Sequence, residues 1–241
     1  MYVFKPTGGF GNTLIHLTTI DNKCTSLHNS IDDYELSNCV IIKDFTRASY
    51  DGEQPDTPLL INLYTSKHIH PKIRNIIKPT PYMEQLIEKN MHMLEGVSCG
   101  MAIRRGSYCE DSRQYSDERS DQPQYFHCSQ SGLEHFKEAM RNTQGRIFIT
   151  SDSQSTLKTL VEEFGNKLVT IDTIFTVGAE HDRVGEKNYT DYHNIYLLFF
   201  MLSKCPHLYI TGGNKDLVGF STYGYMAAIY GNIPFTIIFN D

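Results

Sequence analysis

The stretch that decides the fold begins at residue 97: residues 97–105 read VSCGMAIRR, and residues 146–152 read RIFITSD. Both runs are short and largely apolar, and both end in charged or hydroxyl side chains. From there the chain alternates helical and strand-like patterns, which predicts five strands with four helices between them. Parallel neighbouring strands need crossover connections that are usually helical, so this alternation predicts a parallel sheet covered by helices on both faces. Residues 96–241 are predicted to form one Rossmann-like domain.

The ends of these elements carry ordinary signals. Ser131 with Glu134 three residues later has the pattern of a capping box and predicts a helix that runs to Asn142. A second helical pattern starts at Ser153 and ends at Gly165, a residue typical of helix C-termini. The remaining patterns predict strands at 97–103, 146–150, 167–171, 207–211 and 234–239, and helices at 191–204 and 221–230.

Residues 1–95 are less regular and are predicted to form a separate α/β half. Strand patterns lie at 2–5, 39–45 and 59–64, and a helix is expected from about residue 12. Thr80 followed by Pro81 predicts the start of a helix that continues to Glu95, because proline is well tolerated at the first helical position.

Composition excludes several classes of protein. The chain has 241 residues, of which 40% are hydrophobic and 21% charged, as in ordinary globular proteins. Its net charge of −6 argues against non-specific nucleic-acid binding. The most apolar stretch, 195–202, is far shorter than a membrane span, and the first residues lack the pattern of a signal peptide, so a cytoplasmic location is expected. The six cysteines form no C-x-x-C pair, which predicts reduced thiols and no zinc site.

A glycine-rich turn follows the first predicted strand. Residues 8–12 read GGFGN and precede a helical pattern, where backbone amides and the helix dipole can hold an anion. On this interpretation Gly9, Gly11 and Asn12 contact a phosphate. The alternative is a tight strand-to-helix turn in which glycine supplies a positive φ.

Arg104 and Arg105 end a mostly apolar strand pattern. Open α/β sheets bind ligands at the carboxyl ends of their strands, and guanidinium groups bind phosphate oxygens in a bidentate manner. The pair is therefore predicted to bind phosphate. The alternative is a solvated pair that bridges to Glu110 or Asp111.

Two further strand ends carry polar side chains. Asp152 follows the strand at 146–150 and either accepts hydrogen bonds from a ribose or base, or caps the next helix. Ser221 and Thr222 follow a glycine-rich segment and begin a helix, so they form a second candidate phosphate site, with an N-cap as the alternative. Three strand-to-helix turns on one sheet edge together indicate a nucleotide.

The order of these motifs resembles the fucosyltransferase superfamily, which contains α-1,2-, α-1,6- and protein O-fucosyltransferases. The segment GGFGNTL at 8–14 is similar to the family's G-G-L-G-N-Q-L/M turn, and AIRRGSY at 102–108 to its H-x-R-R-x-D segment. ITSD at 149–152, LSKCPHL at 202–208 and GFSTYG at 219–224 are similar to the T-D-D, L-S-K-C-D-F-L and S-S/T-F-S/G-W-W segments. The chain departs from the family at Ala102 and Ser107, which replace His and Asp, and it contains no tryptophan.

The resemblance implies a GT-B-like α/β fold with two Rossmann-like halves whose parallel sheets face each other across a cleft. Residues 96–241 would bind the nucleotide sugar, and residues 1–95 the acceptor. It further implies an inverting transferase that needs no metal and no cofactor, and that moves a deoxysugar, fucose first, from a GDP donor to a glycan hydroxyl. Arg104 and Arg105 would contact the donor diphosphate.

The catalytic base is expected at Glu110 or Asp111, with His16 as a third candidate. No D-x-D metal motif is evident, since Asp182, Asp191 and Asp216 stand apart in the sequence. Two alternatives stay open: the same fold with another activated sugar, such as rhamnose, xylose or galactose, or a non-catalytic module that binds a nucleotide or a glycan.

Overall fold

A parallel five-stranded sheet forms the centre of the protein. The structure is a computed structural model, and it describes residues 3–4, 11, 14–15, 17–18, 26–28, 39–42, 46–48, 72–105, 127–171, 189–215 and 219–240. The sheet order is β10-β9-β6-β7-β8, with every neighbouring pair parallel. The strands are β6 (Val97–Ile103), β7 (Arg146–Ser151), β8 (Leu168–Val169), β9 (Leu208–Thr211) and β10 (Phe235–Ile238). Read from β8 to β10 and renumbered along the chain, this is the 3-2-1-4-5 order of doubly wound nucleotide-binding sheets. The predicted parallel sheet is confirmed.

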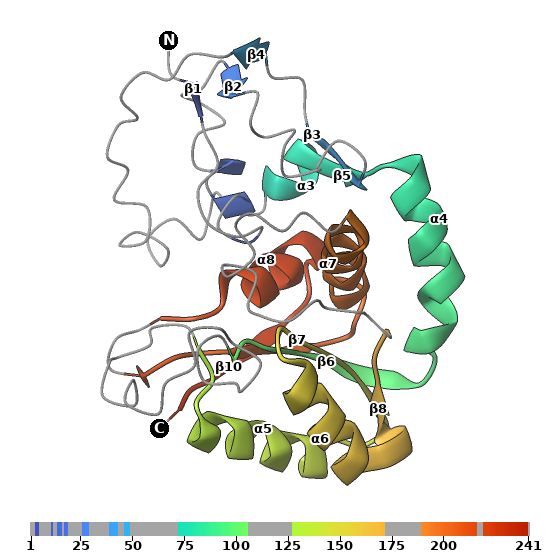
Figure 1. The fold of residues 1–241 in the computed structure, drawn as a ribbon, viewed down its shortest axis with the longest axis vertical. Helices are drawn as coiled ribbons and strands as arrows, with labels where there is room; N and C mark the ends of the chain where they lie inside the picture. The colour runs from blue at the N-terminus through green and yellow to red at the C-terminus, as the bar shows by residue number, and fades with distance from the viewer. Residues whose placement is uncertain are drawn as a thin grey trace.

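Helices cover both faces of this sheet (Figure 1). Helices α5 (Gln130–Asn142) and α6 (Gln154–Phe164) lie on one face, and α7 (Tyr189–Leu202) and α8 (Thr222–Gly231) on the other. Two buried apolar clusters match these two faces. Every residue of α7 from Tyr196 to Leu202 is buried, as expected of a helix that is apolar all round.

The start of α5 differs from the sequence prediction. Ser129, not Ser131, is its N-cap, and the Ser129 hydroxyl accepts a hydrogen bond from the Gly132 amide at 3.2 Å. Ser131 instead donates to the carbonyl of Asn240 at 2.6 Å, a partner 109 residues away. The capping-box prediction was wrong because a tertiary contact uses the serine that the local pattern assigned to the cap.

The first half contains a small parallel sheet in the order β1-β2-β4, made of β1 (Val3–Phe4), β2 (Ser26–His28) and β4 (Thr46–Ala48). Beside it, β3 (Val40–Ile42) pairs antiparallel with β5 (Ile77–Pro79), which follows the short helix α3 (Ile73–Ile76). The sequence analysis missed β2, β4, α3 and β5, because three or four residues are too few to show a periodicity. The strand predicted at 59–64 lies outside the described residues, and the boundary at 95/96 stays a prediction.

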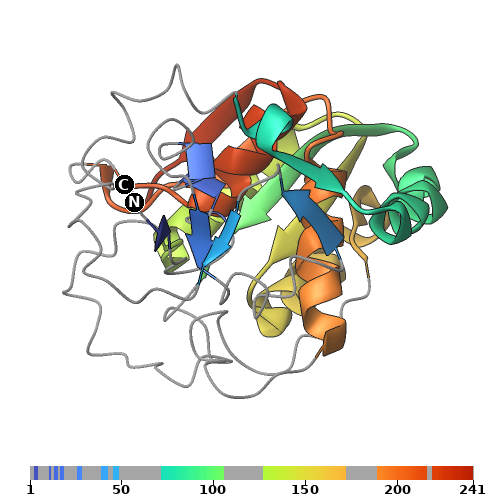
Figure 2. The ribbon, with the colours of Figure 1, turned by 90° about the horizontal axis from the view of Figure 1, so that it is seen from above.

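Helix α4 (Pro81–Asn90) joins the two halves. Thr80 caps it as predicted, with its hydroxyl accepting from the Met83 amide at 3.2 Å, but the α-helix ends at Asn90 and continues as a 3₁₀ turn over Met91–Leu94. Helix α4 packs against α7, and the elements of the first half lie over α7 and α8 (Figures 1 and 2). Helices α7 and α8 are therefore covered from both sides, which explains their apolar sequences.

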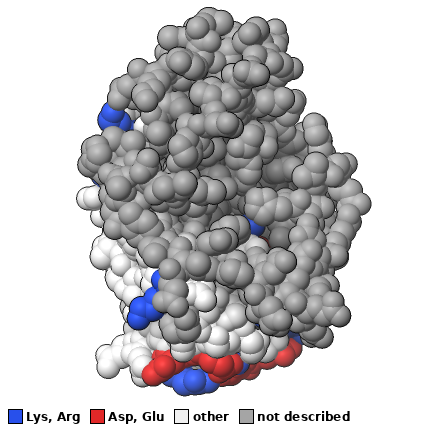
Figure 3. All heavy atoms as spheres, turned by 90° about the vertical axis from the view of Figure 1, so that its left-hand side faces the viewer, with Lys and Arg blue, Asp and Glu red and all other residues white. Residues whose placement is uncertain are grey.

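The outer face of α5 and α6 carries charges of both signs (Figure 3). Lys137 Nζ lies 3.1 Å from Glu134 Oε1 and 2.9 Å from Glu163 Oε2, and Arg141 Nη2 lies 3.0 Å from Glu163 Oε1. The hydrogen bond from Lys137 holds the pKa of Glu163 below its usual value. Such mixed, exposed pairs are typical of a solvated helix surface. In the described part of the chain, no helix combines the length and apolar character that a membrane span requires.

Candidate functional site

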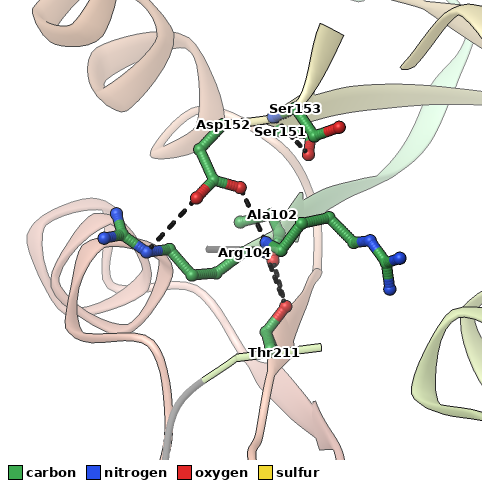
Figure 4. Close-up of polar contacts among 7 residues, drawn as sticks. Ala102, Arg104, Ser151, Asp152, Ser153 and Thr211 are labelled. Atoms are coloured by element: carbon green, nitrogen blue, oxygen red, sulfur yellow. Dashed lines mark hydrogen bonds and ion pairs between the residues drawn. The ribbon is translucent and has the colours of Figure 1, made fainter. Parts of the chain in front are cut away.

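The candidate site lies where the connections of the large sheet reverse direction, between β6 and β9. The β6 strand end is joined to β9 through Thr211, whose hydroxyl accepts from the Arg104 amide at 2.9 Å and donates to the Ala102 carbonyl at 3.1 Å (Figure 4). In open α/β sheets the crevice outside this point is where ligands bind. Sequence analysis missed Thr211, although a hydroxyl residue at the end of a strand and before Gly212 was a usable signal.

Asp152 organises the adjoining strand end. Its Oδ1 accepts from the Arg105 amide at 2.7 Å, and its Oδ2 lies 3.4 Å from Arg104 Nε, with both side chains of this ion pair 13% exposed (Figure 4). Helix α6 is capped by Ser153, whose hydroxyl accepts from the Thr156 amide at 3.1 Å. The interpretation of Asp152 as a helix cap is therefore wrong, and its carboxylate instead orients Arg104.

The two arginines point to different surroundings. Arg104 lines a pocket at the carboxyl edge of the sheet. Arg105 is only 6% exposed, is not among the described lining residues, and donates from Nη1 to the Cys128 carbonyl at 2.7 Å. The Cys128 amide in turn donates to the Arg104 carbonyl at 2.6 Å. Arg105 thus holds the segment that returns to the sheet at His127, whereas the Arg104 side chain reaches the pocket.

Asn240 fastens the same returning segment from the other side. Its side-chain amide donates to the His127 carbonyl at 3.0 Å and accepts from the Ser129 amide at 2.8 Å. The two bonds reproduce the pairing that a neighbouring strand would make. Residues 127–129 are therefore held both by the end of β6 and by the segment that follows β10.

The pocket has a volume of about 60 Å³ and opens beside the first turn of α8. Ser221 is the N-cap residue of this helix, yet its hydroxyl makes no capping bond, although the residue is only 6% exposed. Its backbone amide donates to the Thr211 carbonyl at 2.7 Å, which fixes the helix start to β9. The described lining residues are Ala102, Ile103, Arg104, Thr150, Ser151, Asp152, Ile195, Leu198, Ser221 and Tyr223.

Gly11, from the glycine-rich turn, lies directly against the first turn of α8. A Cβ atom on Gly11 would lie 2.6 Å from the Thr222 carbonyl carbon and 2.7 Å from Tyr223 Cα, distances that real Cβ atoms do not adopt. Gly11 does not have a positive φ, so close approach, and not turn geometry, explains why this position is glycine. Two motifs more than 200 residues apart in sequence therefore meet at one helix N-terminus.

The structure brings together Arg104, Asp152 and Ser221 from the predicted site, with Gly11 beside them. Thr222 is the first residue of α8 but does not line the pocket among the described residues. The remaining predicted residues, Gly9, Asn12, His16, Glu110 and Asp111, lie outside the described residues. Ile195, Leu198 and Tyr223 were not predicted, because only the packing of α7 and α8 brings them to the sheet edge.

Neither a thiol nor a metal cluster contributes to this arrangement in the described ranges. Burial raises the pKa of the Cys128 thiol to about 12 despite the nearby Arg105, so this thiol stays protonated at neutral pH. Among the described residues, no group of three or more His, Cys, Asp or Glu side chains could hold a metal ion.

No family model matches the chain, and no curated protein sequence matches it. Two solved structures of the α-1,6-fucosyltransferase NodZ, one co-crystallised with GDP and one soaked with GDP-fucose, match it with TM-scores of 0.56 at 11% identity. The matches cover 94% and 95% of this chain and 90% and 91% of NodZ. A structure of NodZ from Bradyrhizobium matches with a TM-score of 0.54 at 12% identity, over 94% of this chain and 91% of that one.

Identity at this level establishes the fold and nothing finer. The strand order, the covering helices and the near-complete coverage of both chains agree with each other. The protein therefore has an α/β, GT-B-like fold that is similar to the fold of the fucosyltransferase NodZ.

Proposed function

We propose that this protein is a glycosyltransferase that moves a fucosyl group from GDP-fucose to a glycan hydroxyl, with inversion at the anomeric carbon and without a metal ion. The observation that carries the proposal is the placement of Arg104 beside the first turn of α8, at the switch point of a fucosyltransferase fold. A nucleotide diphosphate leaving group needs positive charge at this point, and Arg104 and the first turn of α8 both supply it.

Arg104 supplies the side-chain part of that charge. Its guanidinium is held by Asp152 through Nε, so the Nη atoms of its planar fork are directed away from the carboxylate. A guanidinium fork matches the geometry of phosphate oxygens and stays charged at all relevant pH values. Arg104 would therefore stabilise the negative charge that develops on the departing diphosphate.

The first turn of helix α8 supplies the backbone part of this positive charge. The first amides of an α-helix have no acceptor within the helix, and its dipole places partial positive charge there. The Ser221 hydroxyl, which makes no capping bond, adds a donor in the pocket wall. Because these dipoles are already oriented before the substrate binds, they need no reorganisation during the reaction.

The reaction itself is one displacement. The acceptor oxygen forms a bond to the anomeric carbon while the bond from that carbon to the β-phosphate oxygen breaks, and its electron pair leaves with GDP. The acceptor proton passes to a general base. We assign this base to Glu110 or Asp111, which follow the arginines in sequence, with His16 as a further candidate.

The first test is nucleotide binding. A ligand that binds only the native state raises the melting temperature, so GDP should raise it and UDP and dTDP should not. Equal shifts by all three nucleotides would contradict a guanine-specific site, and no shift with any of them would contradict a nucleotide site.

The second test is transfer itself. With GDP-fucose and a panel of glycans, the product should carry the anomeric configuration opposite to that of the donor, and the rate should be unchanged in excess EDTA. Loss of the rate under chelation, with recovery on addition of Mg²⁺ or Mn²⁺, would contradict the metal-independent mechanism. Binding of GDP-fucose without hydrolysis or transfer to any acceptor would favour the non-catalytic binding module.

A further inference from the structure

Two hydroxyl side chains in the pocket wall are buried without a bond to the fold. Thr150, near the end of β7, is 5% exposed, and Ser221, at the start of α8, is 6% exposed. Both residues line the pocket, and in the described part of the chain neither side-chain hydroxyl makes a hydrogen bond. Neither hydroxyl oxygen is completely covered, so both reach the space of the pocket. Ser221 belongs to the proposed diphosphate site, and Thr150 borders the same space.

The Thr150 side chain lies on the α7–α8 face of the sheet. Successive side chains of a strand point to opposite faces, and Phe148 belongs to the apolar cluster of the α7–α8 face, so Thr150 points to that face as well. Thr150 is the register partner of Ala102 on β6. Arg104 and Asp152 follow two residues later along the same two segments, and they border the same pocket.

The neighbouring lining residues on this face are apolar. Ala102 has only a methyl group, which packs against α8, since a Cβ atom on Gly224 would lie 2.9 Å from Ala102 Cβ. Ile195 and Leu198 of α7 also line the pocket and carry no polar side-chain atoms. A hydroxyl buried in such surroundings needs water or a ligand as its partner, whereas valine has the same shape without this need. The hydroxyl of Thr150 therefore points to a ligand.

The charge and the size of the pocket select a phosphoryl group as that ligand. Arg104 stays positively charged, and the first turn of α8 carries partial positive charge. A threonine hydroxyl can donate a hydrogen bond to a phosphate oxygen. The pocket volume is about 60 Å³, and a water molecule needs roughly 10–15 Å³ on this measure, so the pocket holds a group of about four heavy atoms.

We propose that Thr150 is a further donor-binding residue, whose hydroxyl donates a hydrogen bond to an oxygen of the donor's β-phosphate. The inference rests on the proposed function, since it needs the diphosphate to lie between Arg104 and α8. The β-phosphate receives the electron pair when the bond to the anomeric carbon breaks, so negative charge grows on this group. A hydroxyl that is already in place stabilises that charge without reorganisation.

Calorimetry with three ligands tests the contact: GDP, GDP-fucose, and GMP, which lacks the β-phosphate. Thr150→Val removes the hydroxyl and keeps the shape of the side chain. It should weaken the binding of GDP and of GDP-fucose by roughly 10- to 100-fold, the range for a hydrogen bond to a charged group. Its affinity for GMP should stay within about twofold of the wild-type value. Thr150→Ser keeps the hydroxyl and should bind GDP within about threefold of the wild type.

The melting temperature of the free protein separates a ligand contact from a structural role. The Thr150 hydroxyl has no hydrogen bond to lose in the described part of the chain, so Thr150→Val should not lower this temperature. Thr156 is a matched control: it is 7% exposed, and its hydroxyl accepts from Ser153 Oγ at 2.9 Å. Thr156→Val should lower the melting temperature and leave all three affinities unchanged.

Three outcomes would overturn the proposal and leave the proposed function intact. An equal loss of GDP and GMP affinity in Thr150→Val would place the hydroxyl at another part of the nucleotide. A loss for GDP-fucose alone would place it at the sugar. Wild-type affinities for all three ligands, with or without a lower melting temperature, would show that the hydroxyl binds no part of the donor.

A second variant and the wild type complete the test. If Thr150→Val does not fold, Thr150→Ala removes the same hydroxyl and carries the same expectations. A wild-type protein that binds no guanine nucleotide would contradict the proposed function and this inference together.

Discussion

Helices α6 and α8 begin at the same edge of the sheet, α6 after β7 and α8 after β9, and each has a serine at its N-cap, yet the two serines are used differently. The Ser153 hydroxyl is completely buried and accepts from the Thr156 amide at 3.1 Å. The Ser221 hydroxyl makes no capping bond and lies in the pocket wall. Thr80 and Ser129 cap α4 and α5 in the ordinary way, so α8 differs from these three helices.

The same division separates the two arginines. Arg104 borders the pocket, and Arg105 donates to the Cys128 carbonyl beneath it. In each pair of like residues, one side chain is bonded within the fold away from the pocket, and the other borders the pocket. The difference teaches that residue type and position along a strand or helix do not decide which side chain reaches a pocket; the tertiary packing around it does.

The largest effect is expected from Arg104, the arginine that borders the pocket. Arg104→Ala should lower kcat/KM for fucosyl transfer by about 2–4 kcal/mol, roughly 30- to 900-fold, because it removes one charge that stabilises the transition state. Steady-state kinetics on the folded variant measure this. Arg104→Lys keeps the charge without the planar fork, so its kcat/KM should lie between that of the wild type and that of Arg104→Ala. Wild-type kinetics in a folded Arg104→Ala protein would show that this guanidinium does not contact the diphosphate.

Arg105→Ala should act on stability. It removes a hydrogen bond from a buried charged group to the Cys128 carbonyl, which should cost about 1.5–3 kcal/mol in the free energy of unfolding. Urea denaturation measures this change. The loss in the free energy of GDP binding, measured by calorimetry, should be smaller. If instead GDP affinity falls while stability is unchanged, Arg105 also binds the donor, as the sequence analysis predicted, and the contrast between the arginines disappears.

The serine pair gives the smallest and most closely matched effects. Ser153→Ala removes a cap and should lower the free energy of unfolding by about 0.5–2 kcal/mol, with GDP affinity unchanged. Ser221→Ala breaks no capping bond, so the melting temperature without ligand should hardly move, while GDP affinity should fall by about 0.5–1.5 kcal/mol. Thermal melts and calorimetry on both variants decide the matter. A stability loss in Ser221→Ala without a loss of affinity would make α8 an ordinary capped helix.

Local patterns were sufficient where an element is long. Strand β6 runs over Val97–Ile103 as predicted, and α6, predicted to start at Ser153 and to stop at Gly165, runs over Gln154–Phe164 with Ser153 as its N-cap. Seven to eleven residues are enough to show the pattern of a strand or a helix. Local patterns failed where a distant residue competes for a side chain, as Asn240 does for Ser131. Local patterns also did not explain why residue 11 is glycine, since a side chain there is excluded by the backbone of Thr222 and Tyr223.

The sequence by itself determined that a parallel sheet forms in the second half and that Arg104, Asp152 and Ser221 follow its strands, because alternating periodicities and end signals are properties of neighbouring residues. Only the tertiary structure decided the strand order, which places Thr211 beside Arg104 across a sequence separation of 107 residues. It likewise decided which arginine and which serine border the pocket, because partners such as Cys128 for Arg105 and Asp152 for Arg104 reach these side chains only when the chain is packed.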